Sequence, residues 1–295
     1  MSPQGRLYLV TTPLGNLDEM SPRAIQILQD VDQVAAEDTR VSRKLFNRFG
    51  ITTKMTSYHQ HNEKEKAKEL CHKMLAGEQI ALITDAGVPG LSDPGEILVQ
   101  QASMLGIPVL AVSCGSAAIH ALVVSGLPTG QFVFEGFLPK ETGKRKKRLE
   151  TSRQDPRTMI FYVTPHGLDK TLQEIEAFLG NRYASLSREL TKWYEETKRG
   201  TLQELLLWVQ EEKPRGEMVL VVAGKDQDVV QPDEAFLELV SLVEAGFKLN
   251  QAASYVAKKY NMPKRTLYNQ YIEESDKKST DPASQGAGYP GRTIE

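Results

Sequence analysis

Short apolar runs alternate with amphipathic segments over the first 127 residues, a pattern typical of strands separated by helices. The apolar runs predict strands at residues 6–12, 32–37, 79–84 and 107–113. Helical spacing of apolar residues predicts helices at 21–30, 43–50, 62–78, 95–106 and 116–126. Strands joined by crossover helices pair in parallel, so this part predicts an open parallel sheet that binds ligands beyond the carboxyl ends of its strands.

The rhythm changes after residue 131. Apolar runs at 131–138, 157–163, 183–190, 192–200 and 217–224 predict strands, and only 144–152, 168–179 and 202–211 have helical spacing. The linker "SGLPTG" separates the two patterns. The sequence therefore predicts an α/β protein with one domain at 1–127 and a second, strand-richer α/β domain at 128–228.

The remainder is helical and then polar. Residues 229–275 predict a helical module in which two short helices flank "YNMPK" as in a helix-turn-helix. Its expected inner face consists of Ala252, Ala253, Val256, Leu267 and Tyr271. Residues 276–295 are rich in Gly, Pro and Ser, and we expect a disordered tail there.

Composition excludes several classes of protein. A chain of 295 residues with 40% hydrophobic and 25% charged residues is an ordinary globular composition, and no apolar run is long enough to span a bilayer. The first ten residues do not form a secretory signal, so the expected location is the cytoplasm. Cys71 and Cys114 have no companion at C-x-x-C spacing, so we expect two reduced thiols rather than a disulfide or a zinc site.

The segment "ALITDAGVPGLSDPG", residues 81–95, concentrates turn-forming residues directly after a predicted strand. Its last eleven positions hold three Gly, two Pro and two Asp. Gly permits positive φ and close approach of a ligand, and Pro stiffens the backbone. The loop therefore has the chemistry of a ligand-binding loop at a strand end, although a long surface connection would have a similar composition.

The motifs "LVTTPLGNLDEM", "VAAEDTR", "DAGVPGLSDPG", "SGLP" with "FVFEGFLP", "RTMIFY", "SRELTK" and "GEMVLVV" occur in this order along the chain. Together they resemble the ribosomal RNA small subunit 2′-O-methyltransferase I family, a branch of the tetrapyrrole methylases. The resemblance implies a two-domain fold with S-adenosylmethionine in the cleft between the domains, a homodimer, and a cytidine ribose of 16S ribosomal RNA, free or in the 30S subunit, as acceptor.

Matching the family motifs residue by residue implies ten donor-binding positions. These are Leu14, Ala86, Gly87, Val88, Leu91, Ser116, Ala117, Val163, Leu190 and Met218. The chain departs from the family pattern at Val88, at Ser113, Cys114 and Gly115, and at Val163 and Gly167. The departures imply that contacts to the donor or the acceptor differ from those usual in the family.

Several acidic and basic side chains are candidates for the chemistry. Glu37 and Asp38, with Arg40 to orient a carboxylate or hold a phosphate, follow a predicted strand on the same side of the sheet as the loop at 81–95. A carboxylate there would deprotonate or align a ribose hydroxyl, but "EDTR" is also good helix-capping chemistry. Glu135, His166 and Glu189 are further candidates. We expect no metal site, because His59 and His61 have no carboxylate or Cys at ligand spacing.

A basic run lies at the start of the second domain. Residues 140–153, "KETGKRKKRLETSR", contain seven basic residues, and we expect the central five to contact RNA phosphates rather than to serve only solubility. These are Lys144, Arg145, Lys146, Lys147 and Arg148. The alternatives to an RNA methyltransferase are a methyltransferase with a small tetrapyrrole-like acceptor and a non-enzymatic nucleic-acid binder built on the helical module.

Overall fold

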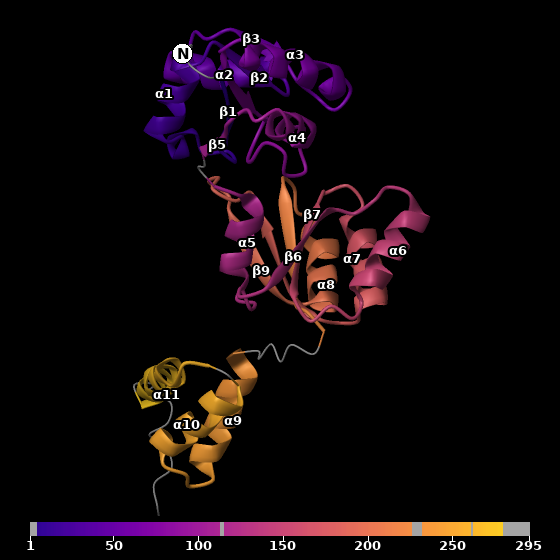
Figure 1. Cartoon of the computed structure of the whole chain (residues 1–295). Helices are drawn as coiled ribbons and strands as arrows, with labels where there is room; N and C mark the ends of the chain where they lie inside the picture. The colour runs from indigo at the N-terminus through magenta and orange to yellow at the C-terminus, as the bar shows by residue number, and fades with distance from the viewer. Residues whose placement is uncertain (1–4, 113–114, 226–231, 261, 280–295) are drawn as a thin grey trace, which may run out of the picture. The chain divides into compact units, whose positions relative to one another are not determined.

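The computed structural model describes residues 5–112, 115–225, 232–260 and 262–279. The chain divides into two compact units, Met1–Gln227 and Asp228–Glu295, and each is described separately (Figure 1). Cys114 and the tail from residue 280 onward, for which sequence analysis predicts a free thiol and disorder, lie outside the described residues.

The first sheet of the larger unit is fully parallel, as predicted, with the strand order β3-β2-β4-β1-β5. Its strands are β1 (Arg6–Val10), β2 (Gln33–Ala36), β3 (Met55–Ser57), β4 (Gln79–Ile83) and β5 (Val109–Val112). The three-residue edge strand β3 was not predicted, because "MTS" has too few apolar residues to show a period.

Helices cover both faces of this sheet. One apolar core joins it to α1 (Pro22–Asp30) and α2 (Thr39–Phe49). A second core joins it to α3 (Glu63–Leu75) and α4 (Glu96–Met104), and it includes the buried free thiol of Cys71. A short 3-10 helix, η1 (Leu17–Glu19), precedes α1. The connections that follow β1, β2 and β4 therefore leave the same edge of a buried parallel sheet.

The second sheet is mixed, with the order β6-β7-β10-β8-β9. Strands β6 and β7 are parallel, and the remaining pairs are antiparallel. The predicted strands are confirmed as β6 (Phe132–Phe137), β7 (Thr158–Val163), β8 (Tyr183–Arg188), β9 (Glu196–Thr201) and β10 (Met218–Val222). The predicted helices are confirmed as α6 (Thr142–Ser152), α7 (Leu168–Leu179) and α8 (Leu202–Glu212).

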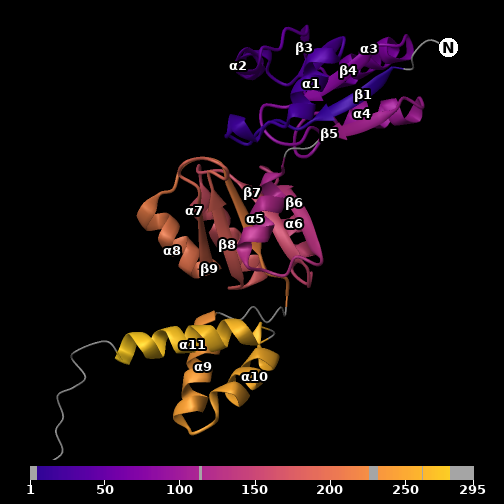
Figure 2. The ribbon, with the colours of Figure 1, turned by 90° about the vertical axis from the view of Figure 1, so that its left-hand side faces the viewer.

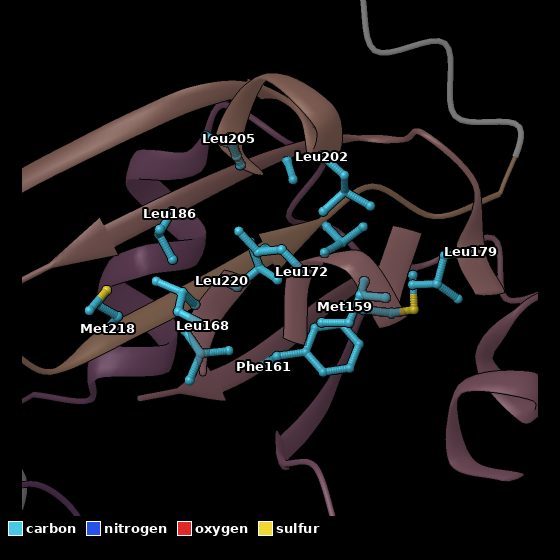
Figure 3. Close-up of a cluster of buried hydrophobic side chains, with 14 of the residues drawn as sticks. Met159, Phe161, Leu168, Leu172, Leu179, Leu186, Leu202, Leu205, Met218 and Leu220 are labelled. Atoms are coloured by element: carbon cyan, nitrogen blue, oxygen red, sulfur yellow. The ribbon is translucent and has the colours of Figure 1, made fainter. Parts of the chain in front are cut away.

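Alternate residues of β7, β8 and β10 supply the core of this sheet. Met159, Phe161, Leu186, Met218 and Leu220 face α6, α7 and α8, where the labelled leucines of α7 and α8 meet them (Figure 3). The side chains between them, such as Val219 and Val221, are also buried and face the opposite side of the sheet. Both faces of the sheet are therefore covered.

Helix α5 (Ala117–Ser125) covers that opposite face. It packs against β7, β8, β9 and β10, on the side away from α6, α7 and α8 (Figure 1). The alternation of strands and helices grouped this helix with residues 1–127, since it directly follows β5. Its buried Ala118, Ala121 and Leu122 nevertheless pack on the second sheet. The chain therefore passes from the first sheet to the second before Ala117, and not at the linker "SGLPTG".

The smaller unit is a three-helix cluster, in which α11 (Lys264–Ser279) lies across α9 (Pro232–Glu244) and α10 (Leu249–Lys259) (Figure 2). The predicted inner face is present: Ala252, Ala253, Val256 and Leu267 are buried, and Tyr271 packs against them. The helix α11 ends at Ser279, beyond the predicted limit of the module at residue 275. No described helix is both long and apolar enough to cross a membrane.

Candidate functional site

The Gly- and Pro-rich loop after β4 is fastened to the chain that follows β1. The backbone N–H groups of Thr12 and Gly87 donate to each other's carbonyl oxygens, at 3.0 Å in both directions. The Thr12 hydroxyl also donates to the carbonyl of Thr84 at 3.0 Å. Gly87 has a φ of +88°, and a Cβ there would lie 3.4 Å from Cδ2 of Leu14. The loop therefore exposes bare backbone in a fixed position.

This loop forms one wall of a cavity of about 240 Å³. The other walls come from the start of α5, from the end of β7, from the start of β10 with the residues before it, and from Leu190 after β8. All ten residues predicted to bind the donor line this cavity: Leu14, Ala86, Gly87, Val88, Leu91, Ser116, Ala117, Val163, Leu190 and Met218. They come from six separate segments of the chain, including the connections that follow β1 and β4 of the first sheet and the strands β7 and β10 of the second, and the fold brings them together.

Nine further residues line the same cavity and were missed by sequence analysis: Ser92, Asp93, Phe137, Tyr162, Thr164, Pro165, Gly216, Glu217 and Val219. Most of them are neighbours of a predicted position. Asp93 could have been identified from its place in the Gly- and Pro-rich loop after β4, directly before Pro94. Of the positions that depart from the family pattern, Val88 and Val163 lie in the lining, and Ser113 and Cys114 lie outside the described residues.

The cavity wall is mainly apolar, with isolated polar groups. Tyr162 stands between Phe134 and Phe137 in edge-on ring contacts, with centroids 5.1 and 5.3 Å away, and burial raises the pKa of its hydroxyl. The Ser116 hydroxyl oxygen is buried beside the Tyr162 hydroxyl, and it has no partner that meets hydrogen-bond geometry among the described residues. A buried hydroxyl without a partner is costly, and such a group suits a polar ligand atom.

Asp38 and Arg40 form a helix cap outside the cavity lining. The Asp38 carboxylate accepts the backbone N–H of Arg40 at 2.8 Å and begins α2, as the capping alternative requires. The Arg40 guanidinium donates to both oxygens of the same carboxylate, at 3.1 and 2.6 Å. These bonds from Arg40 lower the pKa of Asp38 to about 2. The carboxylate is therefore ionised, but its lone pairs are already occupied.

Glu37 is half-buried beside the loop after β4. Its carboxylate accepts the backbone N–H of Asp85 at 3.4 Å, and the Asp85 carboxylate accepts that of Asp38 at 3.2 Å. Burial raises the pKa of Glu37 and of Asp85. Neither side chain lines the cavity. These acids hold the ends of β2 and β4 together and place negative charge close to the cavity.

Asp93 is the carboxylate that lines the cavity without a partner. It receives no hydrogen bond and forms no ion pair within the described part of the chain. Burial, reinforced by the negative charges of Glu37, Asp85 and Glu217, raises its pKa to about 7. An unpaired carboxylate that titrates near neutral pH in a cavity is a group suited to accept a proton.

The other candidate acids and the histidine are engaged elsewhere or exposed. Glu135 accepts from the Arg148 guanidinium at 2.6 Å and from the Ser152 hydroxyl at 2.8 Å, which ties it to α6. Glu189 is bound by Lys192 at 3.1 Å and by the backbone N–H of Glu217 at 3.1 Å. His166 is exposed. None of these three residues is in the cavity lining.

The basic run on α6 divides into two parts. Arg145 forms a bidentate pair with Glu174 of α7, and Arg148 pairs with the largely buried Glu135 of β6, so both fasten the helix to its neighbours. Lys144 pairs with Glu141 at the exposed start of the helix. Lys146 and Lys147 are exposed and form no ion pair within the described residues. Of the central five basic residues, these two lysines alone are wholly available to a polyanion.

The two histidines of "YHQHN" do not belong to a cluster of metal-ligating side chains among the described residues. The rings of His59 and His61 lie 5.9 Å apart in an edge-on arrangement, and the backbone N–H of His59 donates to the side chain of Asn62. No group of three His, Cys, Asp or Glu side chains in the described part of the chain could hold a metal ion.

Known proteins with similar sequences are methyltransferases. Residues 6–206 match the family model of the Tetrapyrrole (Corrin/Porphyrin) Methylases. The ribosomal RNA small subunit methyltransferase I of Halalkalibacterium halodurans is 45% identical over 278 residues, which cover 92% of this chain and 96% of that protein. The protein of the same name from Synechocystis sp. is 44% identical over 273 residues, covering 91% of this chain and 98% of that protein.

Solved structures with the same fold are more distant in sequence. The methyltransferase CobJ has a TM-score of 0.57 at 17% identity, and the likeness covers 77% of this chain and 98% of that one. The uroporphyrin-III C-methyl transferase of Thermus thermophilus, complexed with S-adenyl homocysteine, has a TM-score of 0.51 at 18% identity and covers 74% of this chain and 97% of its own. Fold and sequence agree: the chain is a methyltransferase that belongs to the ribosomal RNA small subunit methyltransferase I family of the tetrapyrrole methylases.

Proposed function

We propose that this protein transfers a methyl group from S-adenosylmethionine to the ribose 2′-hydroxyl of a cytidine in small-subunit (16S) ribosomal RNA, free or within the 30S subunit. The observation that carries the proposal is the single cavity that gathers all ten predicted donor-binding residues. It is supported by relatives of the stated name that match over nearly their whole length. Ribosomal RNA as substrate would place the protein in the cytoplasm.

The residues present fit S-adenosylmethionine. Val88, Leu91 and Met218 would enclose the adenine, since a flat apolar ring needs an apolar slot. The unpartnered Ser116 hydroxyl would take a polar atom of the donor, and the start of α5 at Ala117 would favour its carboxylate. When bound there, the donor supplies a methyl carbon that is already activated for in-line attack, so alignment provides much of the rate.

A hydroxyl acceptor needs a group that takes its proton, and Asp93 is placed to do so. A ribose hydroxyl is a weak nucleophile at neutral pH, and a carboxylate within reach of it contributes about 10²–10⁴-fold to the rate. Asp93 lines the cavity, and no hydrogen bond from another described residue to its carboxylate would have to be broken first. We therefore propose Asp93 as the base, with Glu37 and Asp38 as the remaining candidates and Arg40 as the partner of Asp38.

The direct test incubates the protein and radiolabelled S-adenosylmethionine with 30S subunits, with free 16S RNA, and with a reduced tetrapyrrole. We expect label in RNA, located at a linkage that resists alkaline hydrolysis, because a 2′-O-methyl group removes the hydroxyl that attacks the neighbouring phosphate. Label in the tetrapyrrole would favour the small-molecule alternative. Label on a base, cleavable by alkali at the same position, would contradict ribose methylation.

The proposal also includes a homodimer, which the family resemblance implies. Sedimentation equilibrium of the full chain measures this directly. A molecular mass twice that of the 32.9 kDa chain is the expected result, and a single 32.9 kDa species at micromolar concentration would contradict it.

Lys146 and Lys147 are expected to supply RNA affinity, and their arginine neighbours to supply stability. Replacing both lysines by Gln should weaken RNA binding and lower the log–log salt slope by about 1.4, since each phosphate contact on a single strand contributes about 0.7. The measurement is RNA affinity at several salt concentrations, with donor affinity as the check that the cavity is intact.

The matched control removes the same charge from another exposed surface. Lys64 and Lys68 on α3 are exposed and form no ion pair among the described residues, so Lys64→Gln with Lys68→Gln changes the net charge equally. If this control and the Lys146/Lys147 variant change the salt slope by the same amount, the effect is one of overall charge and α6 has no specific role.

A further inference from the structure

The connection between β8 and β9 exposes two aromatic side chains. Trp193 is 93% exposed, the largest value among the exposed large apolar side chains of the described residues, and the adjacent Tyr194 is 74% exposed. Two adjacent aromatic rings offer flat apolar faces with a polar atom at one end, and Trp and Tyr are enriched at binding surfaces for this reason.

The connection that carries them, residues 189–195, is fixed by its own hydrogen bonds. The backbone N–H of Thr191 donates to the Glu195 carboxylate at 2.7 Å, and that of Lys192 donates to the Glu189 carbonyl at 3.0 Å. Glu189 and Thr191 have φ values of +51° and +66°, which non-glycine residues adopt only when the surroundings hold them there. The rings therefore project from a rigid base, and this lowers the entropy cost of binding.

This rigid base is attached to the rim of the cavity. Leu190 lines the cavity, and the Lys192 ammonium donates to the carboxylate of Glu217, another lining residue, at 3.2 Å. On the other side, the Lys192 side chain crosses Gly15, where an added Cβ would lie 2.3 Å from Cε of Lys192. Gly15 follows Leu14, which also lines the cavity. The aromatic pair is thus anchored to two walls of the site.

A second copy of the chain is a poor occupant for so small an apolar surface. A stable protein interface buries about 800 Å² on each partner and has an apolar centre. The two rings are flanked by the charged Lys192, Glu195 and Glu196 instead. Unstacked nucleobases suit the rings better, because each base offers a flat face and single-stranded RNA is commonly bound by stacking on aromatic side chains.

We propose that Trp193 and Tyr194 form a stacking platform for nucleobases of the acceptor RNA next to the nucleotide whose ribose enters the cavity. This inference rests on the proposed function and deepens it, since it requires the acceptor to be single-stranded at the site. The rings touch neither donor nor reacting atoms in this assignment. They position the RNA, and they should affect its affinity and not the binding of S-adenosylmethionine.

The chain permits a direct optical test. Its two tryptophans are Trp193 and Trp208, so Trp208→Phe leaves Trp193 as the only indole. Titration of this variant with a twelve-nucleotide oligocytidine should quench the fluorescence, because stacking on a base quenches an indole. The same oligonucleotide hybridised to its complement should quench much less. No quenching by the single strand at concentrations that bind the protein would overturn the proposal.

Substitutions supply the functional test. Trp193→Ala should raise the KM for 30S subunits about five- to 150-fold, the equivalent of one lost base–aromatic stack, with donor affinity unchanged. Trp193→Phe should restore most of the affinity, since the ring is retained. Met104→Ala, at a side chain that is 81% exposed on α4, is the control for loss of exposed apolar surface and should change nothing.

The outcomes separate this inference from the proposed function. If the wild-type chain does not methylate ribose in ribosomal RNA, the proposed function fails whatever the fluorescence shows. If it does, and Trp193→Ala leaves the KM for 30S subunits unchanged, the platform is wrong. A loss of dimer mass in Trp193→Ala at unchanged RNA affinity would also overturn it, in favour of a contact between two copies.

Discussion

Asp93→Asn should slow single-turnover methyl transfer to RNA by about two to four decades and leave the affinity for S-adenosylmethionine nearly unchanged. The substitution keeps the shape of the side chain and removes its capacity to accept a proton. Asp93 lines the cavity with an unpaired carboxylate whose pKa burial raises to about 7. In the wild type, the rate should therefore rise with pH up to about 7 and then level off.

The raised pKa of Asp93 also predicts an effect on stability. Thermal unfolding measures this effect, and the same measurement shows whether Asp93→Asn is folded. The pKa of Asp93 is higher in the folded state than its ordinary value of 3.8, so folding favours the protonated form. The stability that this form contributes is fully present below pH 3.8 and is lost as the pH rises through about 7. Asp93→Asn should therefore unfold at a higher temperature than the wild type at pH 8, and the difference should vanish in acid.

Glu37→Gln and Asp38→Asn are the comparison variants. Asp38 caps α2 and binds Arg40, so Asp38→Asn should cost stability and have little direct effect on the chemical step. If either comparison variant loses two or more decades of rate while Asp93→Asn stays close to wild type, the base is Glu37 or Asp38 and the assignment of Asp93 is wrong.

Gly87→Val should abolish measurable binding of S-adenosylmethionine by isothermal titration. Gly87 has a φ of +88°, a conformation that a β-branched residue rarely adopts, and its new side chain would enter the cavity beside Leu14. The loop would have to move, and the paired backbone bonds between Thr12 and Gly87 would be strained. Both effects act on the cavity wall against which we propose that the donor binds.

Gly50→Val is the control for the backbone strain alone. Gly50 ends α2 with a φ of +63°, and a Cβ there would meet nothing within 4 Å. This variant should lose stability to a similar extent and bind the donor normally. Equal donor affinity in a folded Gly87→Val protein and in the wild type would place the donor elsewhere, and it would remove the basis for the proposed site.

The sequence predicted the fold well because its signals are local. Parallel strands such as 79–84 and amphipathic helices such as 168–179 show their periods within one segment, and the structure confirms both. The partner sheet of α5 could not be predicted in this way. Its segment "AAIHALVVS" is apolar on most sides, so the pattern identifies a buried helix but not the sheet on which it packs.

For the cavity too, the sequence predicted what local motifs encode and missed what depends on contacts between distant segments. Family motifs led to ten of its lining residues, which arise from segments as far apart as Leu14 and Met218. The roles of individual charged residues depend on partners that no local pattern reveals. Arg145 and Arg148 looked equivalent to Lys146 and Lys147 in sequence, yet Glu174 and Glu135 engage the arginines only after folding. Asp93 became a candidate because its carboxylate has no partner in the part of the chain that the structure describes.

One cavity is lined both by the connections that follow β1 and β4 of the first sheet and by residues of β7 and β10 in the second. A ligand held there therefore links two separate apolar cores and adds its binding energy to their stability. By mass action, a ligand at 100 times its dissociation constant stabilises the folded state by about 2.7 kcal/mol. Hydrogen exchange should therefore slow in both cores together when donor is added, including in strands such as β3 that contribute no residue to the cavity lining. The ligand would thus report on the cooperativity of the whole larger unit.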